Sequence, residues 1–218
     1  MSRQDQQGFA AYYEKVGKQL DPLEQRLARE HMLVESLCQN HSAITYKLPF
    51  PDALPPRDYR ITFRGLSTIV RVDSDMLPVF GETHVLEIHL PSGFPAEAPV
   101  CYMASEIWHP NIQADEGPYQ GRICGNTEGF GAHYSLDDLI LRIESMLKYE
   151  IYHAELRFPY PEDENIARWV REYAEPLGIV KPGIGVIAHG AMPENWRNHV
   201  KQEQKKLIRM KGGDHDEA

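Results

Sequence analysis

The chain has 218 residues, of which 42% are hydrophobic and 25% charged, a composition typical of one globular domain with extensions or at most two small domains. The formal net charge of −9 argues against a general nucleic-acid-binding protein, because phosphate binding needs a surplus of Lys and Arg. No run of about 18 apolar residues predicts a membrane span, and the N-terminus has no apolar segment typical of a secretory signal. Three widely spaced cysteines do not indicate a disulfide framework, so we expect a cytoplasmic protein with reduced thiols.

Residues 1–20 are polar and are interpreted as an N-terminal extension that includes a short helix. Asp21 and Pro22 then form a helix start, since Asp is a preferred N-cap and Pro is favoured at the first helical position. The apolar residues that follow recur at helical spacing on one face, which predicts an amphipathic helix. These residues are Leu23, Leu27, Val34 and Cys38.

Four short strands are predicted next, at 59–65, 66–73, 84–91 and 100–104. A Pro-rich stretch, 49–58, separates them from the first helix. Alternating apolar and polar residues or β-branched composition indicate each strand, and short connections favour an antiparallel meander. The segment "DSDMLPVFGE", 73–82, is expected to be a loop.

Residues 105–134 have neither helical nor strand periodicity, and a loop of this length is usually functional. Ser135 and Asp138 resemble a capping box at the start of a helix. That helix carries an apolar stripe at Leu136, Leu139, Ile140, Ile143 and Leu147.

A further helix is expected from Asp163 or Glu164 to Glu175, and a Gly/Pro-rich stretch follows it that is expected to drape over the surface. A last helix, about 194–210, carries a basic cluster that is either a solvated face or a contact for an acidic partner. Strands followed by helices indicate an α+β fold with helices on one antiparallel sheet. We predict a domain at 21–175 and a C-terminal extension at 176–218 with a basic helix and a polar tail.

The three cysteines differ in their setting. Cys38 lies on the apolar face of a helix and Cys101 lies inside a strand, so both are expected in the core, where free cysteines are common. Cys124 lies in a Gly-rich loop just before a helix start. Reactive cysteines need partial exposure, so Cys124 is either a nucleophile or a buried anchor of its loop.

Two other kinds of site could use Cys124. His133 and Asp137 could complete a Cys/His/Asp hydrolase, although catalytic Cys and His usually meet only in the fold. His109, His133 or His153 could join Cys124 as zinc ligands, although no paired ligand spacing supports this.

The sequence His109-Pro110-Asn111 is typical of a tight turn. It could be a plain turn, or it could hold an amide close to the thiol. An amide N–H there could stabilise a tetrahedral oxyanion or brace the loop that supports the thiol. The C-terminal "MKGGDHDEA" contains a diglycine but follows a predicted helix, so we interpret it as a polar tail and not as the end of a ubiquitin-like modifier.

Four motifs in this order resemble the ubiquitin-conjugating (E2) family over residues 23–175. They are "LEIHLPSGFPAEAPVCYM", "IWHPNI", "GRICGN" and "YSLDDLILRIESML". The first resembles the family's strand and its Pro-rich turn, the second its His-Pro-Asn turn, and the third its active cysteine. The fourth resembles the family's entry into the helix that follows the active site. The resemblance implies the E2 (UBC) fold: an N-terminal helix, a four-stranded antiparallel meander, an active-site loop and C-terminal helices.

The same resemblance implies roles for individual residues. Cys124 would form the thioester, Asn111 would be the catalytic asparagine, and Asp163, with Glu162 as the alternative, would orient or deprotonate the incoming amine. Four residues would support the active site. These are His109, Pro110, Gly125 and Tyr134, the last standing where the family often has Trp.

The chain also departs from the family pattern. Cys124 follows Asn111 by thirteen residues, which is longer than usual, and "QADEGPYQ" looks like an insertion. Gly125 replaces the common Leu, and "FGAHYS" replaces the W-x-P pattern. These departures resemble divergent bacterial E2-like proteins of ubiquitin-like (Bil) antiphage operons.

The implied activity is transfer of a ubiquitin-like protein from an E1-like enzyme to Cys124 and then to a lysine or other amine of a protein substrate. The resemblance implies neither a metal nor a small cofactor, and neither nucleic acid nor membrane as a partner. Arg26 and Arg29 on the first helix are candidate contacts for the E1-like enzyme. The alternative is a non-catalytic E2-variant or RWD-like binding module.

Overall fold

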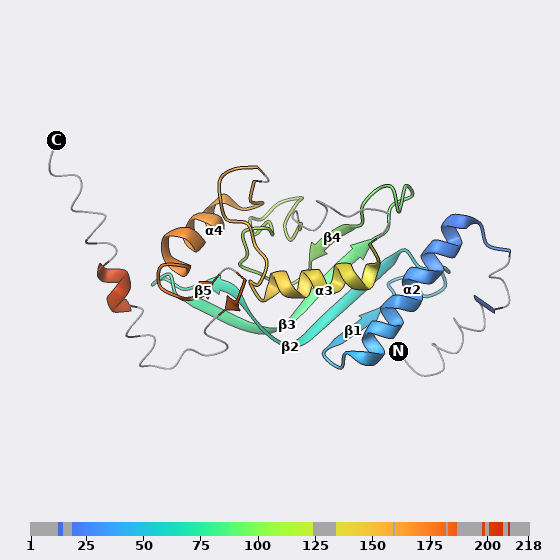
Figure 1. The fold of residues 1–218 in the computed structure, drawn as a ribbon, viewed down its shortest axis with the longest axis horizontal. Helices are drawn as coiled ribbons and strands as arrows, with labels where there is room; N and C mark the ends of the chain where they lie inside the picture. Colours follow the sequence, from blue (N-terminus) through green and yellow to red (C-terminus); the bar gives the residue numbers. More distant parts are fainter. Residues whose placement is uncertain are drawn as a thin grey trace.

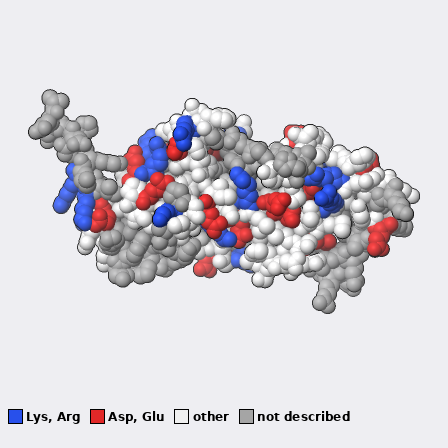
Figure 2. Space-filling model, viewed as in Figure 1, with Lys and Arg blue, Asp and Glu red and all other residues white. Residues whose placement is uncertain are grey.

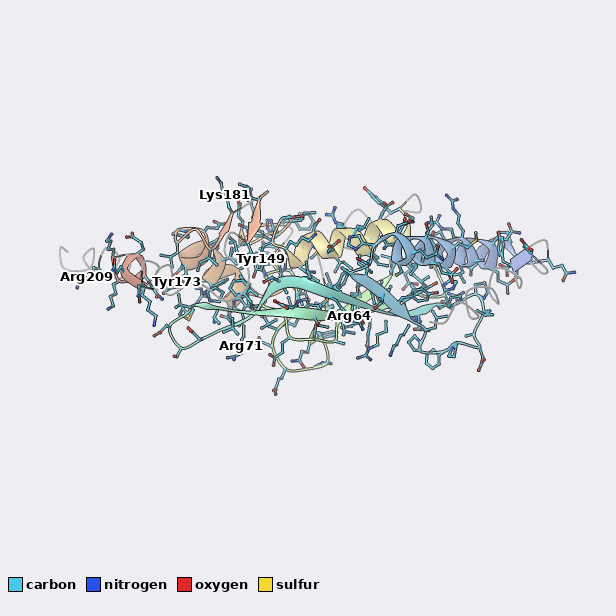
Figure 3. The ribbon with its side chains drawn as sticks, turned by 90° about the horizontal axis from the view of Figure 1, so that it is seen from below. Arg64, Arg71, Tyr149, Tyr173, Lys181 and Arg209 are labelled. Carbon is cyan, nitrogen blue, oxygen red and sulfur yellow. The ribbon has the colours of Figure 1, made fainter. Side chains whose placement is uncertain are left out.

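The computed structural model describes residues 13–14, 19–123, 134–158, 160–181, 183–186, 198, 201–206 and 209. It shows an elongated molecule in which helices lie along one face of an antiparallel sheet (Figure 1). Figure 3, turned by 90°, shows those helices on one side of the sheet and loops on the other. In the described part of the chain, no helix is long and apolar enough to cross a membrane.

Helix α2, Pro22–Asn40, begins at the predicted cap. Asp21 Oδ1 accepts from the Glu24 N–H at 2.8 Å, and Glu24 Oε2 accepts from the Asp21 N–H at 3.1 Å. The two residues therefore form a full capping box. The predicted apolar face is confirmed, because Leu27 and Val34 are buried and Cys38 packs against the same core. Burial raises the pKa of the Cys38 thiol to about 11, with Glu35 adding to the effect, so this thiol stays protonated at neutral pH.

The four-stranded sheet has the order β1-β2-β3-β4, with every neighbouring pair antiparallel. Its strands are β1 Ile44–Lys47, β2 Asp58–Val72, β3 Pro78–His89 and β4 Val100–Met103. The predicted alternation is confirmed, because Tyr59, Ile61 and Phe63 are buried beneath the helices while the residues between them face outward.

The prediction of a four-stranded sheet is confirmed, but two of the predicted strands are one strand, and one strand of the sheet was not predicted. The predicted strands 59–65 and 66–73 are one long strand, β2, which passes through a register shift between Arg64 and Thr68 with Gly65 at φ 67°. An irregularity of this kind keeps the pairing while bending the strand. Strand β1 was not predicted, because four residues at the end of a helix connection carry too short a pattern.

The predicted loop at 73–82 is also wrong beyond Leu77, since β3 begins at Pro78. The turn itself is short: Asp73 Oδ1 accepts from the N–H groups of Asp75 at 2.9 Å and Leu77 at 3.0 Å. Phe80 then packs against a second apolar cluster, and that tertiary contact favours the strand in a segment whose local pattern predicted a loop.

Helix α3, Leu136–Leu147, buries the whole predicted stripe against the sheet. Helix α4, Glu164–Trp169, continues as a π-helix, η1 Val170–Ala174, so the predicted helix is confirmed with a wider turn in its second half. These elements establish the predicted α+β class.

A second apolar cluster forms around α4, η1 and the far end of the β2–β3 hairpin. Trp169 Nε1 donates to the Met76 carbonyl at 3.1 Å and fixes this end of the hairpin. The stretch expected to drape over the surface contributes a small hairpin, β5 Val180–Lys181 and β6 Gly185–Val186, and its valines are buried in this cluster.

The described part of the last helix contacts the β2–β3 turn. Lys201 forms an ion pair with Asp75 at 2.6 Å, and Gln204 donates to the Asp75 carbonyl at 2.9 Å. At least one member of the basic cluster, Lys201, therefore contacts an acidic group of the same chain. Positive and negative side chains are also interspersed across the face shown in Figure 2.

Candidate functional site

The His109-Pro110-Asn111 turn lies in the interior, between β4 and α3. His109 and Asn111 are both buried, and the His109 ring centroid lies 4.7 Å from that of Tyr149. Burial lowers the pKa of His109 to about 3. The ring is therefore neutral, and its Nδ1 accepts from the Asn111 N–H at 3.2 Å. His109 holds the turn from inside and is not placed to exchange protons with solvent.

The Asn111 side chain holds the segment that follows α3. Its Oδ1 accepts from the His153 N–H at 2.8 Å, and its Nδ2 donates to the His153 carbonyl at 3.3 Å. A carboxamide paired in this way with the N–H and the C=O of one residue has a fixed orientation. Since Nδ2 carries two N–H bonds, one serves this brace and the second can serve another acceptor.

The Pro110 carbonyl binds the two residues that precede α4. It accepts from the N–H groups of Glu162 at 2.8 Å and Asp163 at 3.0 Å. Asp163 is the N-cap of α4: its carboxylate accepts from the Ile166 N–H at 2.9 Å and from the Ala114 N–H at 3.4 Å. This buried carboxylate thus has a structural task. Its part in handling an amine remains a prediction.

Glu162, the alternative acid, lies against the turn as well. Its carboxylate accepts from Arg122 Nε at 2.6 Å and forms an ion pair with the same guanidinium. The Arg122 guanidinium also lies 4.6 Å from the centroid of the Tyr119 ring, a cation–π distance. Glu162 is therefore a nearly buried carboxylate neutralised by a half-exposed arginine.

The apparent insertion forms the tip of a hairpin. Ile112 and Ile123 are antiparallel partners, and the Gln113 N–H donates to the Arg122 carbonyl at 3.0 Å. The Gly121 N–H closes the ladder on the Gln113 carbonyl at 2.7 Å. The additional residues lie beyond this ladder, so they do not separate its two ends.

The same hairpin is attached to β4. The Ile123 N–H donates to the Cys101 carbonyl at 3.1 Å, and the Met103 N–H donates to the Gly121 carbonyl at 2.8 Å. Gly121 has φ 80°, and a Cβ built there would lie 2.2 Å from the Met103 carbonyl oxygen. Only glycine fits so close to a neighbouring strand, so Gly121 permits the contact that holds this edge.

Two predicted site residues, Cys124 and Gly125, lie outside the described residues, as does His133 of the hydrolase alternative. The chain is described up to Ile123, which is buried, and again from Tyr134, which is exposed. The Tyr134 carbonyl accepts from Arg26 Nη2 at 2.7 Å. Within the described ranges, no three His, Cys, Asp or Glu side chains are grouped as metal ligands would be.

Sequence reasoning missed the partners of the turn. His153 takes part through its backbone. Tyr149 takes part through a ring that packs at a tilt of 58° against His109 and through a hydroxyl that donates to the Trp108 carbonyl. A backbone partner leaves no mark on the residue type. The stretch "KYEIYH", 148–153, is rich in polar and charged residues, so the sequence gave no signal that Tyr149 is buried.

The part of the chain that holds this turn matches a family model: residues 76–159 match the one described as "Ubiquitin-conjugating enzyme". This segment is similar to the E2 enzymes. It spans β3, β4, the His-Pro-Asn turn and α3, and the match supports an E2-type conjugating enzyme. The N-terminal helix and the four-stranded antiparallel sheet agree with the E2 (UBC) fold.

Solved structures of E2 enzymes were also found. A "Novel Ubiquitin-Conjugating Enzyme" is 21% identical with a TM-score of 0.46, covering 67% of this chain and 84% of that one. The E2 domain of a Toxoplasma gondii ubiquitin conjugating enzyme is 19% identical with a TM-score of 0.47, covering 68% and 88%. A Plasmodium vivax ubiquitin conjugating enzyme E2 is 20% identical with a TM-score of 0.39, covering 55% and 98%. A comparison with curated proteins found no match.

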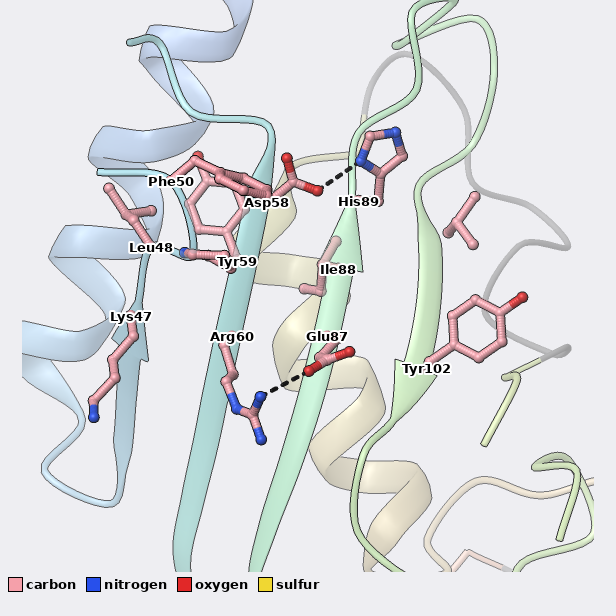
Figure 4. A pocket seen from close by; sticks show the side chains of 12 residues that line it. Lys47, Leu48, Phe50, Asp58, Tyr59, Arg60, Glu87, Ile88, His89 and Tyr102 are labelled. Carbon is pink, nitrogen blue, oxygen red and sulfur yellow. Dashed lines mark hydrogen bonds and ion pairs between the residues drawn. The ribbon is translucent and has the colours of Figure 1, made fainter. Parts of the chain in front are cut away.

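A separate hollow lies on the outer face of the E2-like sheet, away from the helices (Figure 4). Two exposed ion pairs cross it, Arg60 with Glu87 at 2.9 Å and His89 with Asp58 at 2.7 Å. Neither pair contacts the His-Pro-Asn turn. Both are exposed ion pairs, unlike the buried contacts of the turn.

Proposed function

We propose that this protein is an E2-type enzyme that carries a ubiquitin-like protein as a thioester on Cys124. The observation that supports this is the register of the 112–123 hairpin. Ile112 and Ile123 are antiparallel partners, so one further pair in the same register would set Cys124 opposite Asn111. The long sequence spacing is taken up at the hairpin tip, so it is compatible with a thiol close to the asparagine.

The first step would be transthiolation. The Cys124 thiolate attacks the carbonyl of a thioester on an E1-like enzyme, a new S–acyl bond forms, and the E1 thiolate leaves. One thioester is broken and another is formed, so the reactants and products have similar energies. The enzyme therefore contributes mainly by holding the thiolate close to the thioester carbonyl. Arg29 is exposed on α2 and remains a candidate contact for the E1-like enzyme, whereas Arg26 is engaged within the chain.

The second step would be aminolysis of the thioester by a lysine or another amine. The amine nitrogen bonds to the acyl carbon, the tetrahedral intermediate collapses, and the Cys124 thiolate leaves while the amine loses its proton. Asn111, oriented by His153, offers its second N–H to the oxyanion. Glu162 or Asp163 would orient the amine or take its proton.

The remaining predicted residues would support this geometry. His109 and Pro110 fix the turn from within, Gly125 follows the nucleophile, and Tyr134 marks the end of the segment that carries it. We further propose that the modifier comes from a Bil-like antiphage operon, which neighbouring genes for an E1-like enzyme and a ubiquitin-like protein would support.

The decisive experiment is a trapping assay. The protein is mixed with the candidate E1-like enzyme, its ubiquitin-like protein and ATP, and adducts are followed on non-reducing gels and by mass spectrometry. We expect a thiol-sensitive adduct in wild type that becomes a thiol-resistant ester in Cys124→Ser. Cys38→Ser and Cys101→Ser should keep the thiol-sensitive adduct. No adduct with an E1-like enzyme that is itself charged would contradict the proposal and favour the binding module.

A further inference from the structure

Two charged side chains of α2 contact the point where the chain is described again after Cys124. Arg26 Nε lies 2.5 Å from Glu30 Oε1, and Arg26 Nη2 donates to the Tyr134 carbonyl at 2.7 Å. The Arg26 guanidinium also lies 5.6 Å from the centroid of the buried Phe94 ring. Arg26 thus joins α2, the turn after β3 and Tyr134, which lies two residues before α3.

Glu30 caps α3 from a different helix. Ser135 occupies the N-cap position, but its side chain makes no cap bond, because its hydroxyl donates to Asp138 Oδ2 at 2.7 Å. The predicted capping box is therefore wrong, because the Ser135 side chain bonds the Asp138 carboxylate and not a backbone N–H group of the helix. The Leu136 N–H donates instead to Glu30 Oε2 at 2.6 Å. A carboxylate at a helix N-terminus is favoured by the helix dipole and by unpaired N–H groups.

The burial of this pair sets it apart from the ion pairs of the surface. The Glu30 side chain is 1% exposed and that of Arg26 21%, whereas Arg60 and Glu87 are each 50% exposed. A buried carboxylate that loses its cation is strongly destabilised, whereas an exposed pair contributes little. The position of Arg26 is therefore tightly coupled to that of Glu30, and both are coupled to residues 134–136.

We infer that Arg26 and Glu30 are positioning residues for Cys124. This inference rests on the proposed function. The upstream end of the segment is fixed by Ile123 on β4, and the downstream end by Arg26 on Tyr134 and by Glu30 on Leu136. Through these contacts α2 fixes Tyr134 and Leu136, which form the downstream end of the span that begins at Ile123.

Three variants test this inference, and two further variants serve as controls. Arg26→Ala removes the guanidinium, Arg26→Lys keeps the charge but loses the fork, and Glu30→Gln keeps an acceptor for the Leu136 N–H while losing the charge. Arg60→Lys and Glu87→Gln are the matched controls, since they alter the exposed pair on the opposite face of the sheet. Glu30→Gln is included because Arg26→Ala could fail to fold.

Three quantities are measured below the unfolding temperature of every variant. They are hydrogen exchange at the Leu136 amide, the rate at which iodoacetamide alkylates Cys124, located by mass spectrometry, and lysine transfer from enzyme already charged with the ubiquitin-like protein. Only the last requires the conjugation partners, so a failure of the proposed function leaves two measurements that still decide this inference.

We expect Arg26→Ala and Glu30→Gln to accelerate exchange at Leu136, to accelerate alkylation of Cys124 at least about threefold, and to slow transfer about 10- to 100-fold at saturating lysine. Arg26→Lys should recover part of the transfer rate, and both controls should stay within about twofold of wild type. Folded variants with wild-type exchange and alkylation would overturn the inference. Lower thermal stability with unchanged alkylation and transfer would also overturn it, because the pair would then be structural only.

Discussion

The two ends of the segment that carries Cys124 are held by different forces. At the upstream end, Ile123 is held by backbone hydrogen bonds to β4, by pairing with Ile112 and by burial of its side chain. At the downstream end, the Tyr134 carbonyl and the Leu136 N–H are held by the charged side chains of Arg26 and Glu30.

The two ends therefore depend on different features of the sequence. Backbone pairing at the upstream end depends on register, on one glycine and on apolar burial, so it does not depend on a charged side chain. The downstream end depends on two specific side chains and on their charge, so it is sensitive to single substitutions. On the proposed function, the register at the upstream end would set which residue lies opposite Asn111, and the downstream contacts would position Tyr134 and Leu136.

The largest effect is expected where the upstream end meets the turn. Asn111→Ala should lower lysine transfer from the charged enzyme about 10²- to 10³-fold, because the brace on His153 and the donor to the oxyanion are lost together. Single-turnover discharge on non-reducing gels measures this rate. Asn40→Ala, which removes an exposed amide bonded to Ser36, should stay within about twofold of wild type.

Asn111→Asp separates the two tasks of the side chain. It keeps an acceptor for the His153 N–H but has no amide N–H. If the oxyanion matters, Asn111→Asp should be as slow as Asn111→Ala. A rate close to wild type would leave Asn111 as a brace alone.

The next effect concerns the apolar part of the upstream anchor. Ile123→Ala should lower the free energy of unfolding by about 2–4 kcal/mol, because it leaves a cavity between the hairpin and β4. Urea unfolding followed by circular dichroism measures it. Ile184→Ala, an exposed isoleucine, should change the same free energy by no more than about 0.5 kcal/mol.

Acid should lower the stability of the fold through two buried histidines, His31 of α2 and His109 of the turn. The pKa of His109 is lowered to about 3 and that of His31 to about 4, in both cases chiefly by burial, while an unfolded histidine titrates near its ordinary value of 6.5. The unfolded chain therefore binds more protons below pH 6.5. Each histidine should then reduce stability by about 1.4 kcal/mol per pH unit as the pH falls from 6.5 to about 4.

Denaturant unfolding between pH 7 and 4 tests this dependence. His31→Leu removes one of the two contributions, so its stability should fall less steeply with acid than that of wild type. Equal slopes for the two proteins would show that His31 is not kept neutral by the fold.

The smallest effect is expected at the hairpin tip. Deleting residues 115–119 shortens the tip while leaving the Ile112–Ile123 pair in place. We expect lysine transfer to stay within about threefold of wild type, because register and not loop length brings Asn111 to the thiol. A loss as large as that of Asn111→Ala would refute the register argument.

Much of the fold followed from local patterns. Asp21 and Pro22 marked the start of α2, the alternation from Tyr59 to Phe63 marked its strand, and the stripe from Leu136 to Leu147 marked α3. These features repeat with the period of their element, so a single segment contains the signal. Strand β1 and the start of β3 were missed because contacts with distant residues stabilise them.

For the candidate site, the sequence by itself determined the residue types: a His-Pro-Asn turn, a cysteine in a Gly-rich setting and acids at the start of α4. The tertiary structure decided their partners. It assigned Asn111 to the backbone of His153, Asp163 to the cap of α4, and Glu30 to a helix end 106 residues away. A hydrogen bond to a backbone group can be made to any residue type, so only the folded chain shows which group receives it.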